Sequence, residues 1–373
     1  MDSKLIFSLP IEKKIGQLFF IGLPSTQIDE QTRKLIDDIS PGGICLFARN
    51  IREANQTRNL LDEINEILPV KPFLSIDQEG GLVDRLRRII TPMPSASSLK
   101  TKEDVKKLAE ITAEVLRIFG FNMNFAPVVD VIDNSRGTKQ NGIFSRNFGT
   151  SKEEANEFGF TYLNELQKGG ITGCLKHFPG LGASAVDSHE ELPSVNISEN
   201  ELYEIDLFPY RENLEKKIAH CVMVAHAAFP SSDLQETDLN GKLLPSSLSF
   251  KFINKLLRGN LGFQGLVITD DLEMGAILKN YGIGEACKMA IKAGEDMLSI
   301  CADPNRIYEG FDAVLKAVEN GEISEERIDE SLARIAKVKT LVSETIPFDS
   351  ARLQILSDEI ADLNKTLSYS YGG

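Results

Sequence analysis

Eight short apolar runs, each followed by a longer stretch with helical periodicity, constrain the fold of this chain more than any other feature. The runs are continuous rather than alternating, which is typical of parallel strands covered on both faces. A strand followed by a helix about eight times favours a closed barrel over an open doubly wound sheet. The sequence therefore predicts a single (β/α)8 TIM-type barrel of the α/β class, with room for one irregular or reversed strand. The predicted strands lie at residues 19–22, 42–47, 71–77, 122–131, 172–178, 221–227, 265–271 and 297–300.

The stretches between these runs contain recognisable helix ends. Three of them begin at a Ser or Thr with an acidic residue three positions later, which is the pattern of a capped first turn, at Thr101, Ser151 and Ser198. Residues from about 323 to 373 are also predicted to be helical and to cover the floor or edge of the barrel. Because no Pro/Gly-rich linker or internal repeat interrupts the pattern, we expect residues 1–373 to form one domain.

Composition narrows the classes of partner. The net charge of −14 is spread along the chain, and an acidic surface repels phosphate backbones and anionic lipid, so neither nucleic acid nor a membrane is expected as a partner. No apolar stretch approaches the roughly 20 residues that span a bilayer. The start, MDSKLIFSLPIEKK, lacks a basic leader and a cleavage site, which predicts a cytoplasmic protein. The five cysteines are widely spaced inside apolar runs and are expected to be buried free thiols.

Most of the predicted strands end in a charged or titratable residue. In a (β/α)8 barrel the carboxyl ends of the strands converge on one pocket, so these side chains should face each other across it. Any one of them could instead be a strand terminator or a local cap. Three of the four histidines, His177, His189 and His226, lie in or beside such strand ends. The strand-end residues are Asp77, Asp130, Lys176, His177, His226, Asp270 and Asp271.

Three chemistries could use such a set. A catalytic metal would need more ligands than His177, His226 and one aspartate, and no HxH or HExxH pair is present. Lys176 could form a Schiff base, but no glutamate or tyrosine relay is evident beside it. Displacement at a sugar carbon needs only a carboxylate such as Asp270 and a mobile acid. No metal and no other cofactor is therefore expected.

Several motifs, in order and at matching spacing from about residue 12 to 340, resemble those of the β-N-acetylglucosaminidases of glycoside hydrolase family 3. The most specific is KHFPGLG followed by DSH and LPSV, which resembles the family's KHFPGHG…DSH…LP. The absence of tryptophan excludes the SDW form of the family's β-glucosidases and favours the acetamido-sugar branch. The matching segments are PGGICLFARNI (41–51), SIDQEGGLVDRL (75–86), APVVDV (126–131), SRNFG (145–149), KHFPGLG (176–182), DSH (187–189) and VITDDLEMGAI (267–277).

The resemblance implies a retaining double displacement. Asp270 would be the nucleophile, His189 the acid/base, and Asp187 the residue that orients His189. The small residues within 180–185, which are all but Leu181, predict a mobile lid. Asp271 is the alternative nucleophile, because strand alternation points adjacent side chains to opposite faces. The sugar-contacting positions of the family correspond to Asp77, Arg85, Arg146, Lys176 and His177.

The remaining matched positions are less clearly functional. His226 and Asp130 are expected behind the sugar-contacting residues, with Asp130 orienting Lys176 or Arg146. Leu82 stands where the family usually has arginine, and Leu181 where its lid motif usually has histidine, which predicts differences in the lid and on the aglycone side.

The function implied is a cytoplasmic exo-β-N-acetylglucosaminidase that acts on GlcNAc-containing carbohydrate, with muropeptides of cell-wall recycling as substrates. We expect a monomer or weak oligomer. A β-N-acetylglucosaminide phosphorylase and a sugar-binding protein that has lost turnover stay open as alternatives. The first is suggested by the histidine acid/base, which repels phosphate less than a carboxylate would, and the second by Leu82 and Leu181.

Overall fold

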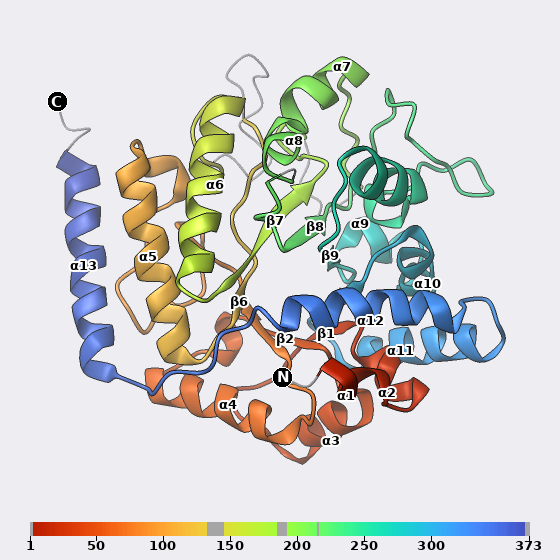
Figure 1. Ribbon diagram of the computed structural model, residues 1–373, viewed down its shortest axis with the longest axis horizontal. Helices are drawn as coiled ribbons and strands as arrows, with labels where there is room; N and C mark the ends of the chain where they lie inside the picture. The colour runs from red at the N-terminus through yellow and green to blue at the C-terminus, as the bar shows by residue number, and fades with distance from the viewer. Residues whose placement is uncertain (1–2, 133–144, 185–191, 215, 370–373) are drawn as a thin grey trace.

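The computed structural model describes residues 3–132, 145–184, 192–214 and 216–369 (Figure 1). Eight parallel strands close into a barrel in the order β1-β10-β9-β8-β7-β6-β3-β2, and helices surround it. The predicted (β/α)8 barrel is thus confirmed, and each strand lies within the apolar run predicted for it. The strands are β1 (Phe19–Gly22), β2 (Gly43–Leu46), β3 (Phe73–Ile76), β6 (Met123–Asn124), β7 (Thr172–Phe178), β8 (Cys221–Val224), β9 (Leu266–Asp271) and β10 (Met297–Ile300).

All eight pairings around the barrel are parallel, so none of the described barrel strands is reversed. One irregular strand is β6, which has two residues although the apolar run continues to residue 131. Its Asn124 side chain exchanges hydrogen bonds with the backbone of Gln78, and Pro127 has no N–H to donate. The ladder therefore ends early, with a single further bridge between Val128 and Lys176.

Helix starts follow the predicted caps. The Thr101 side chain accepts from the N–H of Asp104 at the start of α5, and Ser151 does the same for Glu154 at the start of α6. Ser198 caps the short α7 through Glu201. The helices are α1 (Ser3–Phe7), α2 (Ile11–Gly16), α3 (Glu30–Ile39), α4 (Ala54–Ile67), α5 (Lys102–Phe119), α6 (Lys152–Lys168), α7 (Glu199–Glu201), α8 (Phe208–Leu214), α9 (Gly275–Leu278), α10 (Ile283–Ala293), α11 (Pro304–Glu319), α12 (Glu325–Lys339) and α13 (Ser350–Tyr369), with a further helical segment at Lys251–Asn260.

The barrel interior is filled by large apolar side chains. The ring of Phe20 packs 5.9 Å from that of Phe73 and 5.3 Å from that of Phe125, which ties β1, β3 and the end of β6 together. All five cysteines are buried and free, as predicted. None of the described helices is long and apolar enough to cross a membrane.

The amino-terminal ends of the strands hold a charged cluster beneath this core. The buried Asp296 carboxylate lies 2.6 Å from Nη2 of Arg258 and 2.9 Å from Nη1 of Arg334. Its neighbour Glu295 is fully buried, and neither of its carboxylate oxygens has a hydrogen-bond partner among the described residues. The ammonium of Lys339, at the end of α12, is also buried and donates to Oε1 of Gln17. Buried ionisable groups, some of them without an ion-pair partner among the described residues, therefore collect at this end of the barrel.

Candidate active site

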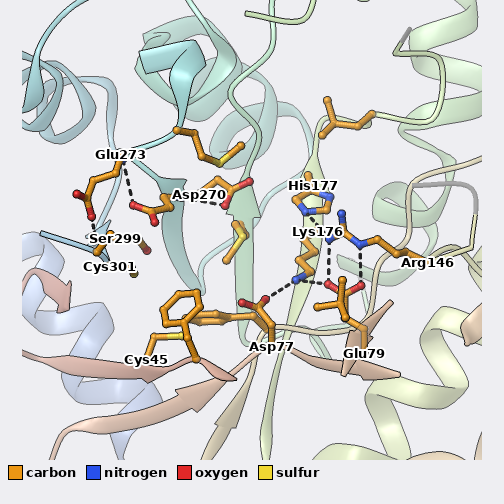
Figure 2. A pocket seen from close by; sticks show the side chains of 18 of the residues that line it. Cys45, Asp77, Glu79, Arg146, Lys176, His177, Asp270, Glu273, Ser299 and Cys301 are labelled. Atoms are coloured by element: carbon orange, nitrogen blue, oxygen red, sulfur yellow. Dashed lines mark hydrogen bonds and ion pairs between the residues drawn. The ribbon is translucent and has the colours of Figure 1, made fainter. Parts of the chain in front are cut away.

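A cavity of about 340 Å³ opens at the carboxyl-terminal end of the barrel (Figure 2). Its lining comes from the ends of β2, β3, β7, β8, β9 and β10 and from loops that follow the strands, including the segment after β6. Strand-end convergence thus brings together residues that lie nearly 200 positions apart in the chain. Six of the predicted site residues line the cavity: Asp77, Arg85, Arg146, Lys176, His177 and Asp270.

The predicted catalytic pair Asp187 and His189 lies outside the described residues. The chain that leads to it is described as far as Ser184, and both Leu181 and Ser184 line the cavity. Leu181, one of the two departures from the family motif, is 4% exposed and presents an apolar side chain to the pocket. Leu82, the other departure, is 68% exposed, while its neighbour Val83 lines the cavity.

One wall of the cavity is a network of opposite charges. Nζ of Lys176 lies 2.7 Å from Oδ1 of Asp77 and 2.6 Å from Oε1 of Glu79. The guanidinium of Arg146 holds the same Glu79 carboxylate through Nε and Nη2, at 2.8 and 2.9 Å. Burial disfavours ionisation of Glu79, but Lys176 and Arg146 outweigh it and hold the pKa of its carboxyl far below the ordinary value. The carboxylates of Asp77 and Glu79 in turn raise the pKa of Lys176 against the effect of burial, so Lys176 and Glu79 face each other as an ion pair.

Arg85 lies beside this network with part of its bonding capacity unused. Its Nη2 is 3.7 Å from Oδ2 of Asp77, and its guanidinium lies 5.6 Å from the ring centre of Phe47. The Nε of Arg85 is buried and has no partner among the described residues. The side chain as a whole is 28% exposed, so a polar ligand in the cavity can be reached by its accessible N–H groups rather than by the buried Nε.

His177 is fixed by Asp130 from behind. Oδ2 of Asp130 lies 2.7 Å from Nδ1 of the ring, and Oδ1 accepts from the backbone N–H groups of His177 and Leu181 at 3.2 and 2.7 Å. The other ring nitrogen, Nε2, lies 3.4 Å from Nη2 of Arg146. Asp130 therefore binds the imidazole of His177, whereas orientation of Lys176 or Arg146 was predicted for it. The reason is that Asp130 follows the shortened β6, beside the end of β7.

Two consecutive side chains of β7 and two of β9 line the cavity, although a regular strand would turn one of each pair away. The pairing of β7 with β8 shifts register between Leu175 and Phe178, around Lys176 and His177. The pairing of β9 with β10 shifts register between the partners of Ile268 and Asp271. Irregularities of this kind re-aim side chains. Both Asp270 and Asp271 consequently line the cavity.

The two adjacent aspartates differ in their electrostatic surroundings. Burial disfavours ionisation of Asp270, but the imidazoles of His177 and His226, the backbone N–H of Asp271 and the ammonium of Lys176 outweigh it and lower its pKa. For Asp271, burial together with the carboxylates of Glu273 and Asp270 raises the pKa to about 7. The pair thus combines a carboxylate that is ionised at neutral pH with a neighbour that is half protonated there.

His226 follows β8 and contacts the end of β9, but it does not line the cavity. Its Nδ1 lies 2.7 Å from Oγ of Ser247 and its Nε2 lies 3.1 Å from the carbonyl oxygen of Asp271. Burial lowers the pKa of this imidazole, so it is neutral at pH 7 and can donate to that carbonyl. His226 is therefore placed to fix the backbone at the end of β9.

Two charged residues of the cavity were not predicted as site residues from the sequence. Glu79 lies in the SIDQEGG segment, for which no role of this residue was predicted. The available signal was a charged residue only two positions after the strand-end Asp77. Glu273 lies in the VITDDLEMGAI segment, and its carboxylate accepts from the backbone N–H groups of Ala302 and Asp303. Among the described residues, no group of three or more His, Cys, Asp and Glu side chains is arranged to hold a metal ion.

Comparison with known proteins assigns this chain to a family. Residues 10–338 match the model described as the glycosyl hydrolase family 3 N-terminal domain. The chain belongs to glycosyl hydrolase family 3. It is 32% identical over 285 residues to a beta-hexosaminidase of Psychromonas ingrahamii, covering 74% of this chain and 80% of that protein. It is 29% identical over 360 residues to beta-hexosaminidase A of Pseudoalteromonas piscicida, covering 90% of this chain but spanning only 59% of that relative.

The fold of this chain is also that of a solved family 3 structure. A family 3 beta-N-acetylglucosaminidase from Paenibacillus sp. str. FPU-7 superposes with a TM-score of 0.85 at 35% sequence identity, covering 95% of this chain and 69% of that one. The resemblance to family 3 inferred from the sequence motifs is confirmed.

Proposed function

We propose that this chain is an exo-acting β-N-acetylglucosaminidase that removes terminal β-linked GlcNAc with retention of configuration. The observation that carries the proposal is Asp270, a carboxylate with a lowered pKa that lines the cavity together with Lys176 and His177. The names of the relatives, beta-hexosaminidase and beta-N-acetylglucosaminidase, support the same activity.

In the first step an oxygen of Asp270 bonds to the anomeric carbon as the bond from that carbon to the glycosidic oxygen breaks. His189 donates a proton to the departing oxygen, and Asp187 orients the imidazole and stabilises its charged form. In the second step His189 removes a proton from water, which attacks the anomeric carbon and releases Asp270. An imidazole suits both transfers because its ordinary pKa lies near neutral pH.

The charged wall would bind the sugar. Asp77 can accept hydrogen bonds from sugar hydroxyls, while Lys176, Arg146, His177 and Arg85 can donate them. The Arg85 side chain is 28% exposed, so it can donate to the sugar although its Nε is buried. Because these groups are already held by ion pairs and by Asp130, they need little rearrangement when the sugar binds.

The proposal also includes a natural substrate, a cellular location and an oligomeric state. We infer muropeptide fragments of cell-wall recycling as substrates, a cytoplasmic location and a monomer or weak oligomer, on the resemblance to family 3 β-N-acetylglucosaminidases. We also infer that residues 1–373 act as one catalytic unit without a metal or other cofactor.

Hydrolysis of 4-nitrophenyl β-GlcNAc by the purified chain tests the activity. We expect turnover by the wild type, loss on the order of 10⁴-fold for Asp270→Ala, and about 10²- to 10⁴-fold for His189→Ala. Proton NMR should show the β-anomer of GlcNAc as the first product. An inactive wild type that binds GlcNAc would instead indicate a sugar-binding protein, and formation of GlcNAc-1-phosphate in phosphate buffer would indicate a phosphorylase.

A further inference from the structure

Helix α13 lies beyond the end of the family 3 match at residue 338 and packs on the outside of α5 (Figure 1). Its inner face is an apolar stripe at helical spacing, and every member is at most 7% exposed. The stripe consists of Leu353, Leu356, Ile360, Leu363 and Leu367. At one end, Arg352 holds the Glu114 carboxylate of α5 through Nε and Nη2, at 2.6 and 2.7 Å.

Two polar side chains beside this stripe bind a loop rather than α5. Oγ of Ser357 accepts from the backbone N–H of Thr91 at 2.8 Å and lies 2.7 Å from the Thr91 hydroxyl. Nδ2 of Asn364 donates to the carbonyl oxygen of Pro92 at 2.9 Å. Ser357 and Asn364 are seven residues apart and therefore share one face of the helix. Two consecutive loop residues are thus held by α13.

The next loop residue connects this contact to the pocket. The N–H of Met93 donates to Oδ2 of Asp84 at 2.8 Å, and its carbonyl accepts from the N–H of Gly81 at 3.0 Å. Oδ1 of Asp84 accepts from Nε2 of Gln78 at 2.8 Å, and Oε1 of Gln78 accepts from the N–H of Arg85 at 3.0 Å. A chain of buried hydrogen bonds therefore joins the segment held by α13 to the backbone of Arg85.

Close packing makes this connection stiff. The hairpin formed by β4 (Gln78–Gly80) and β5 (Val83–Asp84) turns at Gly80 and Gly81, where φ is +90° and +59°. A Cβ on Gly80 would lie 2.1 Å from the carbonyl oxygen of Pro94, so only glycine allows the loop to approach so closely. Movement of residues 91–94 would then be transmitted to the hairpin that carries Arg85.

We propose that α13 is a positioning element for Arg85, with Ser357 and Asn364 acting through the 91–93 segment. This inference rests on the proposed function, in which Arg85 holds the sugar. Among the described residues the Arg85 guanidinium is oriented by a 3.7 Å contact with Asp77 and by the Phe47 ring at 5.6 Å, both of them weak, so its direction also depends on where its backbone is held. Ser357 and Asn364 do not line the cavity, and their effect on the reaction is indirect.

The test compares Ser357→Ala/Asn364→Ala with wild type in hydrolysis of 4-nitrophenyl β-GlcNAc. We expect KM to rise about fivefold to tenfold, the size expected for hydrogen bonds that hold one binding group, while kcat changes less. Ser357→Thr, which keeps the hydroxyl, should retain the wild-type KM. Ser368→Ala is the matched control, since that hydroxyl bonds only to the carbonyl of Asn364 within α13 among the described residues.

A double-mutant comparison separates positioning from general loosening of the fold. In an Arg85→Ala background the same α13 substitutions should raise KM no further, because the residue through which they act is gone. An unchanged KM, or an equal rise with and without Arg85, would overturn the inference. A wild type that does not hydrolyse the substrate would overturn the proposed function instead, so the two failures are distinguishable. If the double variant does not fold, the single variants Ser357→Ala and Asn364→Ala answer the same question.

Discussion

The carboxylate of Glu79 lies between two cations, with Oε1 2.9 Å from Nη2 of Arg146 and 2.6 Å from Nζ of Lys176. Without it, two buried positive charges would face each other beside Asp77 alone. Glu79 is 7% exposed, so water screens this repulsion poorly. The charged wall that we propose to bind the sugar therefore depends on a residue that does not itself need to touch the sugar.

Replacing this carboxylate tests that dependence. We expect Glu79→Gln to lower kcat/KM about 100-fold and the free energy of unfolding by about 3 kcal/mol, because it breaks a buried ion-pair network and leaves a cation uncompensated. Steady-state kinetics and urea unfolding measure the two effects. Glu110→Gln, which removes the exposed partner of Lys106, is the control and should change both by little. Activity within threefold of wild type would contradict the prediction.

The two aspartates of β9 should respond differently to amide substitution. Asp270→Asn is expected to lose about 10⁴-fold in kcat, whereas Asp271→Asn should stay within about tenfold of wild type at pH 6. The folded pKa of Asp271, about 7, lies above its ordinary 3.8, so its contribution to stability is present below pH 3.8 and lost as pH rises through 7. Asp271→Asn should therefore gain stability relative to wild type as pH rises from 4 to 8, by about 2 kcal/mol. Equal losses of activity in both variants would count against Asp270 as sole nucleophile.

Glu295 offers a test of stability away from the pocket. Burial and the neighbouring Asp296 raise its pKa well above the ordinary value, and the carboxyl makes no hydrogen bond with the described residues. Its stabilising contribution is present below the ordinary pKa of 4.5 and is lost as pH rises. Glu295→Gln should therefore be more stable than wild type by about 1 to 3 kcal/mol at pH 8 and by less at pH 5. Urea midpoints at the two pH values check this, and a less stable variant at pH 8 would show that Arg258 and Arg327 already neutralise an ionised Glu295.

Lys339 should show the opposite pH dependence. Burial lowers the pKa of its ammonium to about 7, and its stability contribution is present above the ordinary value of 10.5 and lost as pH falls through 7. Lys339→Met fills a similar volume without a charge, so we expect a gain of about 1 to 2 kcal/mol at pH 6 that shrinks at pH 9. Thermal unfolding at both pH values measures the change. Since Nζ of Lys339 donates to Gln17, a variant that is less stable at pH 6 would mean that this hydrogen bond outweighs the buried charge.

The barrel was predictable because burial on both faces leaves a continuous apolar run, and the caps at Thr101 and Ser151 depend on residues three positions apart. The membership of the pocket was also largely predictable, since strand ends such as Asp77, Lys176 and Asp270 converge in any barrel of this type. Strand periodicity could not predict which side chains of β7 and β9 face the cavity. The register shifts that turn both members of the β7 and β9 pairs toward the cavity arise from pairing with β8 and β10, which no local pattern records.

Tertiary contacts also decide the partner of each polar residue. Asp130 binds His177 because the backbone after β6 stays hydrogen-bonded to β7, where the N–H of Val129 donates to the carbonyl of Lys176. Glu79 was missed for a similar reason: its two cations come from residues 146 and 176, and only the closed barrel brings them together.

The register shifts at β7 and β9 also constrain any redesign of this barrel. A designer who idealised these two strands to regular pleating would keep every residue type and still rotate one of Lys176 and His177, and one of Asp270 and Asp271, out of the cavity. Transplanting the site to another scaffold therefore requires copying the irregular backbone along with the side chains.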